Sequence, residues 1–208
     1  MSKNFFEIKD VTFAIGGKNK VNDVNISIKN EGDTICILGP SGIGKTTMLR
    51  TIAGLEKINK GEIILKDKVI SSDKIHIEPE KRNIALSFQE NSLFPHYSVD
   101  KNIHLGIKKN SPTDKNIFSK EIIKILNIED ILSKYPHQIS AGEAQRASLA
   151  RSLISQPDLL LLDEPLSNVD QSFKEDIQVS LKQLLNKNKI TTIVVTHDSY
   201  EAFYLGNK

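Results

Sequence analysis

The stretch Thr34-Ile35-Cys36-Ile37-Leu38-Gly39-Pro40-Ser41-Gly42-Ile43-Gly44-Lys45-Thr46-Thr47 decides the fold. The apolar run from Ile35 to Leu38 predicts a buried strand, and the apolar spacing from 48 to 55 predicts a helix after it. Between them lies the pattern G-x-x-x-x-G-K-[ST], whose glycines let backbone N–H groups converge on a concave surface. These N–H groups and the positive end of the helix dipole favour a phosphate chain, so the stretch predicts a nucleotide-binding loop.

Two side chains of this loop carry the expected chemistry. Lys45 supplies a positive charge for the β- and γ-phosphates, and the Thr46 hydroxyl can join the coordination of Mg²⁺. An ordinary glycine-rich turn is the alternative, but the required strand before the pattern and helix after it are both predicted. We expect the nucleotide to contact the whole loop, which comprises Gly39, Pro40, Ser41, Gly42, Ile43, Gly44, Lys45, Thr46 and Thr47.

Composition restricts the function of the 208-residue chain, which is long enough for one large domain or two small ones. The net charge of +2 and the scattered lysines give no reason to expect nucleic-acid binding. The sequence has neither a signal peptide nor a run of about 18 apolar residues, so we expect a cytoplasmic protein or one peripheral to a membrane. Cys36, the only cysteine, should be a small buried hydrophobe rather than a reactive thiol.

Periodicity divides the rest of the chain into strand-rich and helical parts. Strands are predicted around the phosphate loop in the first third, and the segment from 91 to about 155 is predicted to be a mainly helical lobe. The leucine run 159–162 predicts a strand covered on both faces, as in a parallel sheet, and 191–196 predicts a last buried strand.

Polar residues follow three more of the predicted strands. Gln89, Asp163-Glu164 and His197 stand at carboxyl ends of strands, where open parallel sheets bind ligands. Asp163 is placed to hold Mg²⁺, Glu164 could polarise a water for in-line attack on the γ-phosphorus, and His197 could hydrogen-bond the γ-phosphate. Singly they would be an exposed glutamine, a capping acid and a surface histidine, but their common location argues against that. The assigned catalytic group is Glu164, His197 and Gln89, and the assigned metal ligands are Thr46, Gln89 and Asp163.

The segment Ser140-Ala141-Gly142-Glu143 matches a capping box, in which the serine oxygen and the glutamate close the first turn of a helix. Apolar residues at 147, 150, 153 and 154 give this helix a buried face. The N-terminus of such a helix is also suited to an anion.

Six motifs in order make the chain resemble the ATP-binding subunits of ABC transporters over nearly its whole length. They are the phosphate loop, Gln89 within Ser87–Glu90, the signature-like segment Ile139–Arg146, the Walker B-like Asp163-Glu164-Pro165, the D-loop-like Leu166–Asp170 and the switch histidine His197. The segments Pro79–Ala85 and Leu93–Val99 are similar to the importer branch that serves sugars, polyamines, ferric iron and thiamine.

The resemblance implies the ABC ATPase fold, which is an α/β phosphate-loop NTPase core with a mixed, mainly parallel sheet flanked by helices. An antiparallel β subdomain and a helical subdomain complete the single ATP-binding domain, 1–208. Residues 1–89 and 156–208 would form the catalytic core with the β subdomain, and residues from about 90 to 155 would form the helical subdomain with the signature.

The resemblance also implies partners. Two copies would face each other head to tail, with each ATP and its Mg²⁺ between the loop of one and the signature of the other. Ser140, Ala141, Gly142 and Glu143 would then contact nucleotide in trans. A membrane permease would bind near Gln89 and Leu93–His96, and an external solute-binding protein would act indirectly. The chain would therefore hydrolyse ATP at the inner face of the cell membrane to drive import.

The chain departs from the family pattern at three places. Ala141 and Glu143 stand where Gly and Gln are usual, which could alter the contacts in trans. Ile15 stands where an aromatic residue usually stacks on adenine, although Phe13 shares its face of the strand and could approach the ring. The given sequence ends at Lys208 without the final strand-and-helix segment or the regulatory domain of many relatives, so it offers no basis for predicting regulation by a C-terminal domain.

Two other classes of protein compete with the importer subunit. A soluble, non-transport ABC ATPase of DNA repair or the ribosome would generally carry a long coiled-coil insertion or a second cassette, and this sequence has neither. A phosphate-loop GTPase or kinase would leave the signature-like segment unexplained, and the guanine-specifying Asn-Lys-x-Asp is absent. Ferric iron, polyamine, sugar and thiamine remain candidate solutes, with iron slightly favoured.

Overall fold

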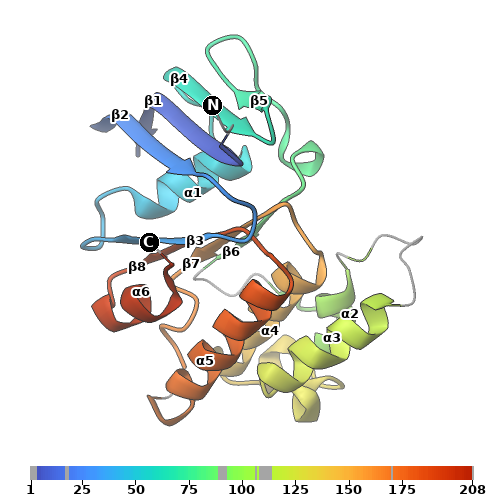
Figure 1. Ribbon diagram of the computed structural model, residues 1–208. Helices are drawn as coiled ribbons and strands as arrows, with labels where there is room; N and C mark the ends of the chain where they lie inside the picture. Colours follow the sequence, from blue (N-terminus) through green and yellow to red (C-terminus); the bar gives the residue numbers. More distant parts are fainter. Residues whose placement is uncertain are drawn as a thin grey trace.

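Two four-stranded β-sheets organise the computed structural model, which describes residues 4–16, 19–88, 93–105, 107, 114–169 and 171–207. One sheet is antiparallel with the order β2-β1-β4-β5, and the other is parallel with the order β3-β8-β7-β6. The strands are β1 (Phe6–Ile15), β2 (Asn19–Ile28), β3 (Thr34–Leu38), β4 (Lys60–Leu65), β5 (Lys68–Ser71), β6 (Ile84–Ser87), β7 (Leu159–Asp163) and β8 (Thr192–Thr196). The antiparallel sheet lies at the top of Figure 1, and the parallel sheet crosses the middle.

One helix lies between the two sheets, and the others cover the opposite face of the parallel sheet. They are α1 (Lys45–Ala53), α2 (Val99–His104), α3 (Asp114–Ile125), α4 (Ala141–Ile154), α5 (Gln171–Lys187) and α6 (Ser199–Leu205). Short 3₁₀ turns occur at Pro79–Lys81, Glu129–Ile131 and Pro136–Gln138. Figure 1 shows α1 between the two sheets and α2, α3 and α4 together at the opposite end from the antiparallel sheet. None of the helices within the described ranges is long and apolar enough to cross a bilayer.

Two hydrophobic clusters meet at the parallel sheet. Leu159 and Leu161 of β7 belong to the cluster that includes α1 and the antiparallel sheet, whereas Leu160 and Leu162 belong to the cluster of the helices on the other side. Every residue of β7 and β8 is buried. The prediction that the leucine run forms a strand covered on both faces is therefore confirmed.

Parallel pairing places the carboxyl ends of three strands at one edge of the sheet. Leu38 of β3 lies opposite Thr196 of β8, and Asp163 of β7 lies opposite Val195 of β8. The segments that follow these strands therefore start from neighbouring positions. This is how residues more than a hundred positions apart in the sequence come to share one site.

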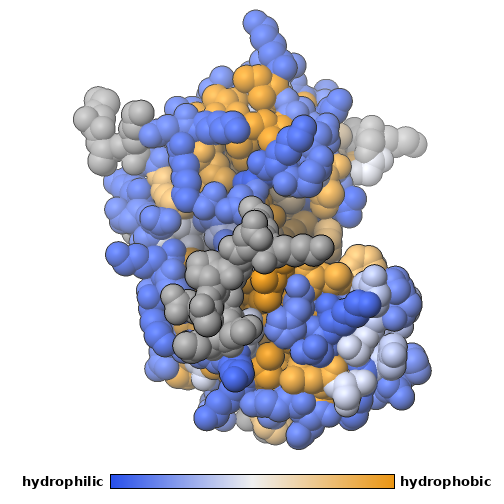
Figure 2. All heavy atoms as spheres, turned by 90° about the vertical axis from the view of Figure 1, so that its right-hand side faces the viewer, coloured by the Kyte–Doolittle hydropathy of each residue, from blue (hydrophilic) through white to orange (hydrophobic). Residues whose placement is uncertain are grey.

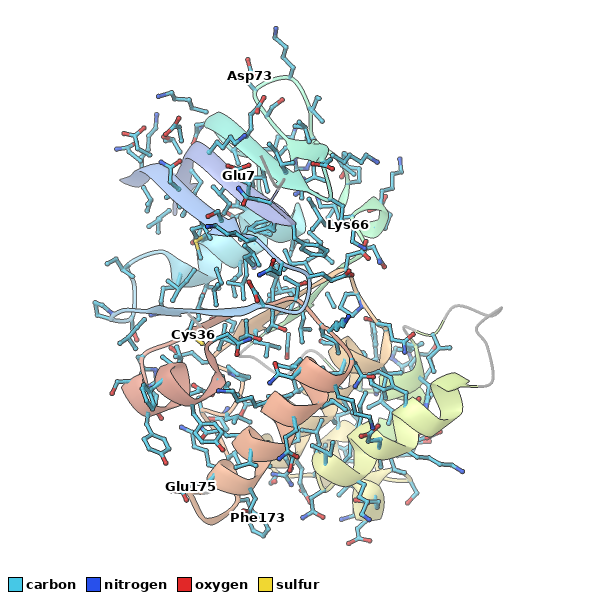
Figure 3. The ribbon with its side chains drawn as sticks, in the orientation of Figure 1. Glu7, Cys36, Lys66, Asp73, Phe173 and Glu175 are labelled. Carbon is cyan, nitrogen blue, oxygen red and sulfur yellow. The ribbon has the colours of Figure 1, made fainter. Side chains whose placement is uncertain are left out.

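Cys36 lies on the side of β3 that faces α6 (Figure 3). Burial, together with the nearby charge of Glu201, raises the pKa of the thiol to about 11. The thiol therefore stays protonated and unreactive at neutral pH. The expectation of an unreactive cysteine agrees with this, although the side chain is half-buried rather than fully buried.

Arg82 connects the end of α1 to the antiparallel sheet. Its guanidinium donates to the carbonyl of Ile77 (2.6 Å), to the carbonyl of Ile52 (2.9 Å) and to the hydroxyl of Ser71 (2.8 Å). Gly54, which ends α1 with φ of 86°, leaves room for this side chain, since a Cβ there would lie 2.4 Å from Arg82 Nε. Burial lowers the pKa of Arg82 to about 10, so the group stays charged at neutral pH.

Replacing Arg82 with alanine should lower the free energy of unfolding by at least about 2 kcal/mol, because buried carbonyl groups lose their donors. Urea denaturation at neutral pH measures this. The matched control is Arg50→Ala, which removes a surface pair with Glu56 (2.7 Å) and should cost under about 1 kcal/mol. Equal losses for the two variants would contradict the role given to Arg82.

Candidate functional site

The phosphate loop runs from the end of β3 to the first turn of α1. Gly42 and Gly44 have φ of 83° and 103°, values in the left-handed region that glycine adopts without steric cost. Gly44 precedes α1 and has no side chain that could cap the free N–H groups of the first turn. The hollow above these groups has a volume of about 180 Å³ and is lined by Ile15, Ser41, Gly42, Gly44, Lys45, Thr46, Thr47 and Glu164.

Lys45 folds back over the loop. Its ammonium group donates to the carbonyl oxygens of Gly39 (2.6 Å) and Pro40 (2.9 Å), and little of the residue is exposed. Two neutral carbonyl oxygens thus hold the ammonium group beside the hollow. An anionic ligand can draw it away from them, because hydrogen bonds between charged partners are stronger.

Asp163 ends β7 beside the first turn of α1. It is 4% exposed and accepts a hydrogen bond from the Thr46 hydroxyl. Burial raises the pKa of this carboxyl, while the Thr46 hydroxyl and the charge of Lys45 oppose the rise. The hydroxyl and the carboxylate are the hard oxygen ligands that Mg²⁺ prefers. No group of three or more His, Cys, Asp or Glu side chains that could hold a metal ion occurs among the described residues.

Glu164 follows Asp163 directly and has a backbone φ of 47°. Its N–H donates to the carbonyl of Val195 (2.9 Å), and its buried side chain lies 3.0 Å from Nδ1 of His197. The side chain of His197 is 58% exposed. The arrangement can hold a carboxylate as a general base, with the imidazole orienting it.

The structure brings the loop, Asp163, Glu164 and His197 together, as the sequence predicts. Gln89, the remaining member of the predicted catalytic and metal groups, lies outside the described residues.

The signature-like segment forms a second, separate hollow of about 410 Å³. Ser140 caps α4: its hydroxyl accepts from the N–H of Glu143 (3.2 Å), and the Glu143 carboxylate accepts from the N–H of Ser140 (2.7 Å). The predicted capping box is confirmed. The hydrogen bond from the Ser140 N–H is the main cause that lowers the pKa of Glu143. Ser140, Ala141, Gly142 and Glu143 all line this hollow and none of them lines the first.

Ile15 and Phe13 have different surroundings. Ile15 lines the loop hollow and packs on Gly44, where an added Cβ would lie 2.5 Å from its side chain. Phe13 is buried in the core below the antiparallel sheet. Of the two, only Ile15 lines the hollow, whereas Phe13 is buried in the core.

The sequence analysis places Gln145 in the signature-like segment but gives it no role. This buried residue of α4 hydrogen-bonds the segment that contains Glu164. Its place in that segment was the signal that could have pointed to it.

Comparison with known proteins agrees with this geometry. A family model described as ABC transporter matches residues 21–167. The chain belongs to the ABC transporter family. The resemblance inferred from the motifs is thus confirmed.

Curated relatives cover nearly the whole chain. The chain is 38% identical over 203 residues to an Fe(3+) ions import ATP-binding protein of Escherichia coli O157:H7. It is also 38% identical over 205 residues to a maltose/maltodextrin import ATP-binding protein of Mannheimia succiniciproducens. Each match takes in 97% of the chain but only 57% and 53% of the respective relative, so the chain spans little more than half of their lengths.

Solved structures confirm the fold class. A dimeric ATP-binding cassette in a post-hydrolysis state, bound to ADP and Pi, matches with a TM-score of 0.80 and 28% identity, covering 96% of this chain and 90% of its own. A part of the ABC transporter complex cbiONQ from Clostridium perfringens matches with a TM-score of 0.76 and 27% identity, covering 94% of this chain and 79% of its own. The α/β fold with one parallel and one antiparallel sheet is therefore that of ABC ATPase cassettes.

Proposed function

We propose that the chain binds Mg-ATP and hydrolyses it to drive solute import through a separate membrane permease. The observation that carries this proposal is the hollow at the end of the parallel sheet, which Lys45, Thr46 and Glu164 line. Asp163 accepts a hydrogen bond from Thr46, and His197 lies 3.0 Å from the Glu164 carboxylate. The names of the relatives favour an importer over the alternative, a soluble ABC ATPase of DNA repair or the ribosome.

Each side chain has a defined part in this mechanism. Lys45 leaves the two loop carbonyls and neutralises phosphate oxygens, while the N–H groups of the loop hold the phosphate chain. Thr46 and Asp163 would hold Mg²⁺, which when bound offsets charge on the β- and γ-phosphates. Glu164 accepts the proton of the attacking water, and His197 keeps the carboxylate in place.

A second copy of the chain would complete the site. The signature hollow and the loop hollow share no lining residue, so Ser140 does not border the hollow of its own phosphate loop. A head-to-tail pair can place Ser140 against the nucleotide in the loop of the other copy, and the cassette of known structure with ADP and Pi is dimeric. We therefore assign the trans contacts to Ser140, Ala141, Gly142 and Glu143.

The surface that would meet the permease lies near α2. Phe94 is 47% exposed, and its ring contacts the rings of His96 and Tyr97 and the guanidinium of Arg151. Figure 2 faces the end of the molecule where α2 and α3 lie, and it shows apolar surface in the lower half between hydrophilic side chains. Such a rigid aromatic group suits a helix that docks into a groove. The preceding residue, Leu93, is buried in the helical core, so the predicted segment Leu93–His96 divides between core and surface.

The proposed function also implies a cellular location, an indirect partner and a solute. The chain would lie at the inner face of the cell membrane, held by the permease, with an external solute-binding protein as an indirect partner. Iron is slightly favoured as the solute because iron-import subunits recur among the relatives, although a maltose-import subunit is equally similar. The permease rather than this chain would recognise the solute.

Glu164→Gln should keep ATP binding and lower the hydrolysis rate by about 10²–10⁴-fold, because an amide cannot act as a general base. Lys45→Ala should instead abolish nucleotide binding. Fluorescent nucleotide titration and phosphate release, measured with and without permease, separate the two effects. Retention of more than half of the wild-type turnover by Glu164→Gln would disprove its assignment as the base.

Phe94→Ala should lower permease-stimulated hydrolysis several-fold and leave the ATP affinity of the isolated subunit unchanged, because it removes only an exposed contact. The matched control is Ile75→Ala, which removes an exposed apolar side chain from the turn after β5. If both variants keep full stimulation, the permease contact lies elsewhere. If Phe94→Ala unfolds, the residue belongs to the core of the helical end.

Ile15→Tyr should tighten ATP binding without changing the chemical step. An isoleucine offers the base no aromatic face, whereas stacking on an aromatic ring is worth about 1–3 kcal/mol, or roughly 5- to 150-fold in affinity. The wild type should also discriminate poorly between ATP and GTP. Titration of both proteins with both nucleotides measures these affinities. Equal affinities of the variant and wild type for ATP would mean that another residue holds the base.

A further inference from the structure

The side chain of Gln145 joins α4 to the segment that follows β7. It is only 3% exposed. Its amide nitrogen donates to the carbonyl of Glu164 (2.8 Å) and to the hydroxyl of Ser167 (3.2 Å), and its amide oxygen accepts from the N–H of Asn168 (2.9 Å). One side chain therefore binds three points of the five residues 164–168.

Backbone contact reinforces this connection. Gly142 lies three residues before Gln145, on the same face of α4. A Cβ at Gly142 would lie 2.6 Å from the carbonyl oxygen of Asn168, so only glycine allows the helix to approach the segment this closely. The first turn of α4 and the segment 164–168 must therefore move together or separate.

The hydrogen bond from Gln145 reaches the backbone of the proposed general base. Glu164 has φ of 47°, a conformation that non-glycine residues hold only when their surroundings impose it. The N–H of Glu164 donates to Val195 of β8, and its carbonyl accepts from Gln145 of α4 (2.8 Å) and from the N–H of Ser167 (3.2 Å). Gln145 is therefore the contact through which α4 holds the backbone of Glu164, beside the contact of the carboxylate with His197.

We propose that Gln145 is a positioning residue that couples the signature end of α4 to Glu164 of the same chain. The inference rests on the proposed function. When Ser140 and Gly142 engage nucleotide held by the partner copy, the shift of α4 is passed through Gln145 to the local general base. Occupation of one ATP site thereby prepares the other for hydrolysis.

A second buried glutamine provides a matched control. Gln178 of α5 is 1% exposed, and its amide nitrogen has no hydrogen-bond partner in the described part of the chain. Gln178→Leu and Gln145→Leu therefore make the same chemical change at equally buried positions, but only the second removes bonds to the segment 164–168.

The test compares ATP hydrolysis by the two variants and the wild type. Gln145→Leu should lower kcat by about 10- to 100-fold, since small misplacement of a reacting group has effects of this size, while KM stays within about twofold. It should also lower the Hill coefficient for ATP toward one. Gln178→Leu should retain the wild-type values. Hydrogen exchange at the Asn168 amide, which loses its acceptor, should become faster only in Gln145→Leu.

Gln145→Glu keeps the experiment decisive if the leucine variant does not fold. A protonated carboxyl can donate to the Glu164 carbonyl, whereas the ionised form cannot. The ratio of variant to wild-type kcat should therefore rise as the pH is lowered from about 8 to about 6. Because an ionised glutamate at this buried site would also destabilise the fold, kcat is expressed per folded molecule, with the folded fraction measured by circular dichroism at each pH. A purely structural role would then give a ratio that does not change with pH.

Different results would overturn the proposed function and the role of Gln145. A wild type that binds ATP but never hydrolyses it, even with permease, overturns the proposed function and the coupling with it. A wild type that hydrolyses ATP, with Gln145→Leu at an unchanged kcat and Hill coefficient, overturns the role of Gln145 alone.

Discussion

Burial of two adjacent carboxyl groups at the end of β7 is the constraint on which the site depends. Asp163 and Glu164 lie at the edge of a strand that is covered on both faces, where an ionised carboxylate is poorly solvated. Burial raises the pKa of Asp163, and the groups that oppose this rise are the Thr46 hydroxyl and the Lys45 charge. A cation bound beside Asp163 would favour its ionised form further. Within this chain, Thr46 and Lys45 therefore only partly offset the cost of burying the charge of Asp163.

The same edge of the sheet requires unusual backbone conformations. Gly42 and Gly44 take left-handed φ values so that N–H groups point into the hollow, and Glu164 takes one without being glycine. The strand β8 supplies a backbone acceptor to the N–H of Glu164, and its last residue pairs with the last residue of β3. A single buried strand therefore fixes both the loop and the base. This explains how a precise site can be built from segments that are exposed to solvent.

The sequence was most informative where local patterns decide the structure. The leucine run, the phosphate loop and the capping box of Ser140 each depend on neighbouring residues, and each is found as predicted. The roles of Arg82 and Gln145 were not predicted, because the partners of their side chains lie about 20 to 30 residues away in the sequence and no local pattern indicates those partners. Phe13 and Ile15 share a strand face by period two, but the core ends between them, so the pattern could not tell which one borders the hollow.

The capping box also bears on how the signature could receive a phosphate. The Ser140 hydroxyl accepts from the N–H of Glu143, yet a hydroxyl keeps its own proton to donate. Capping of α4 and a hydrogen bond to a phosphate oxygen are therefore compatible in the same state. Glu143 adds a complication, because the Ser140 N–H lowers the pKa of its carboxyl and keeps it charged at neutral pH. That charge opposes an incoming anion at the end of α4, where the helix dipole attracts it. A glutamine at this position could keep the cap without this repulsion, because its amide oxygen can accept the Ser140 N–H without carrying a charge.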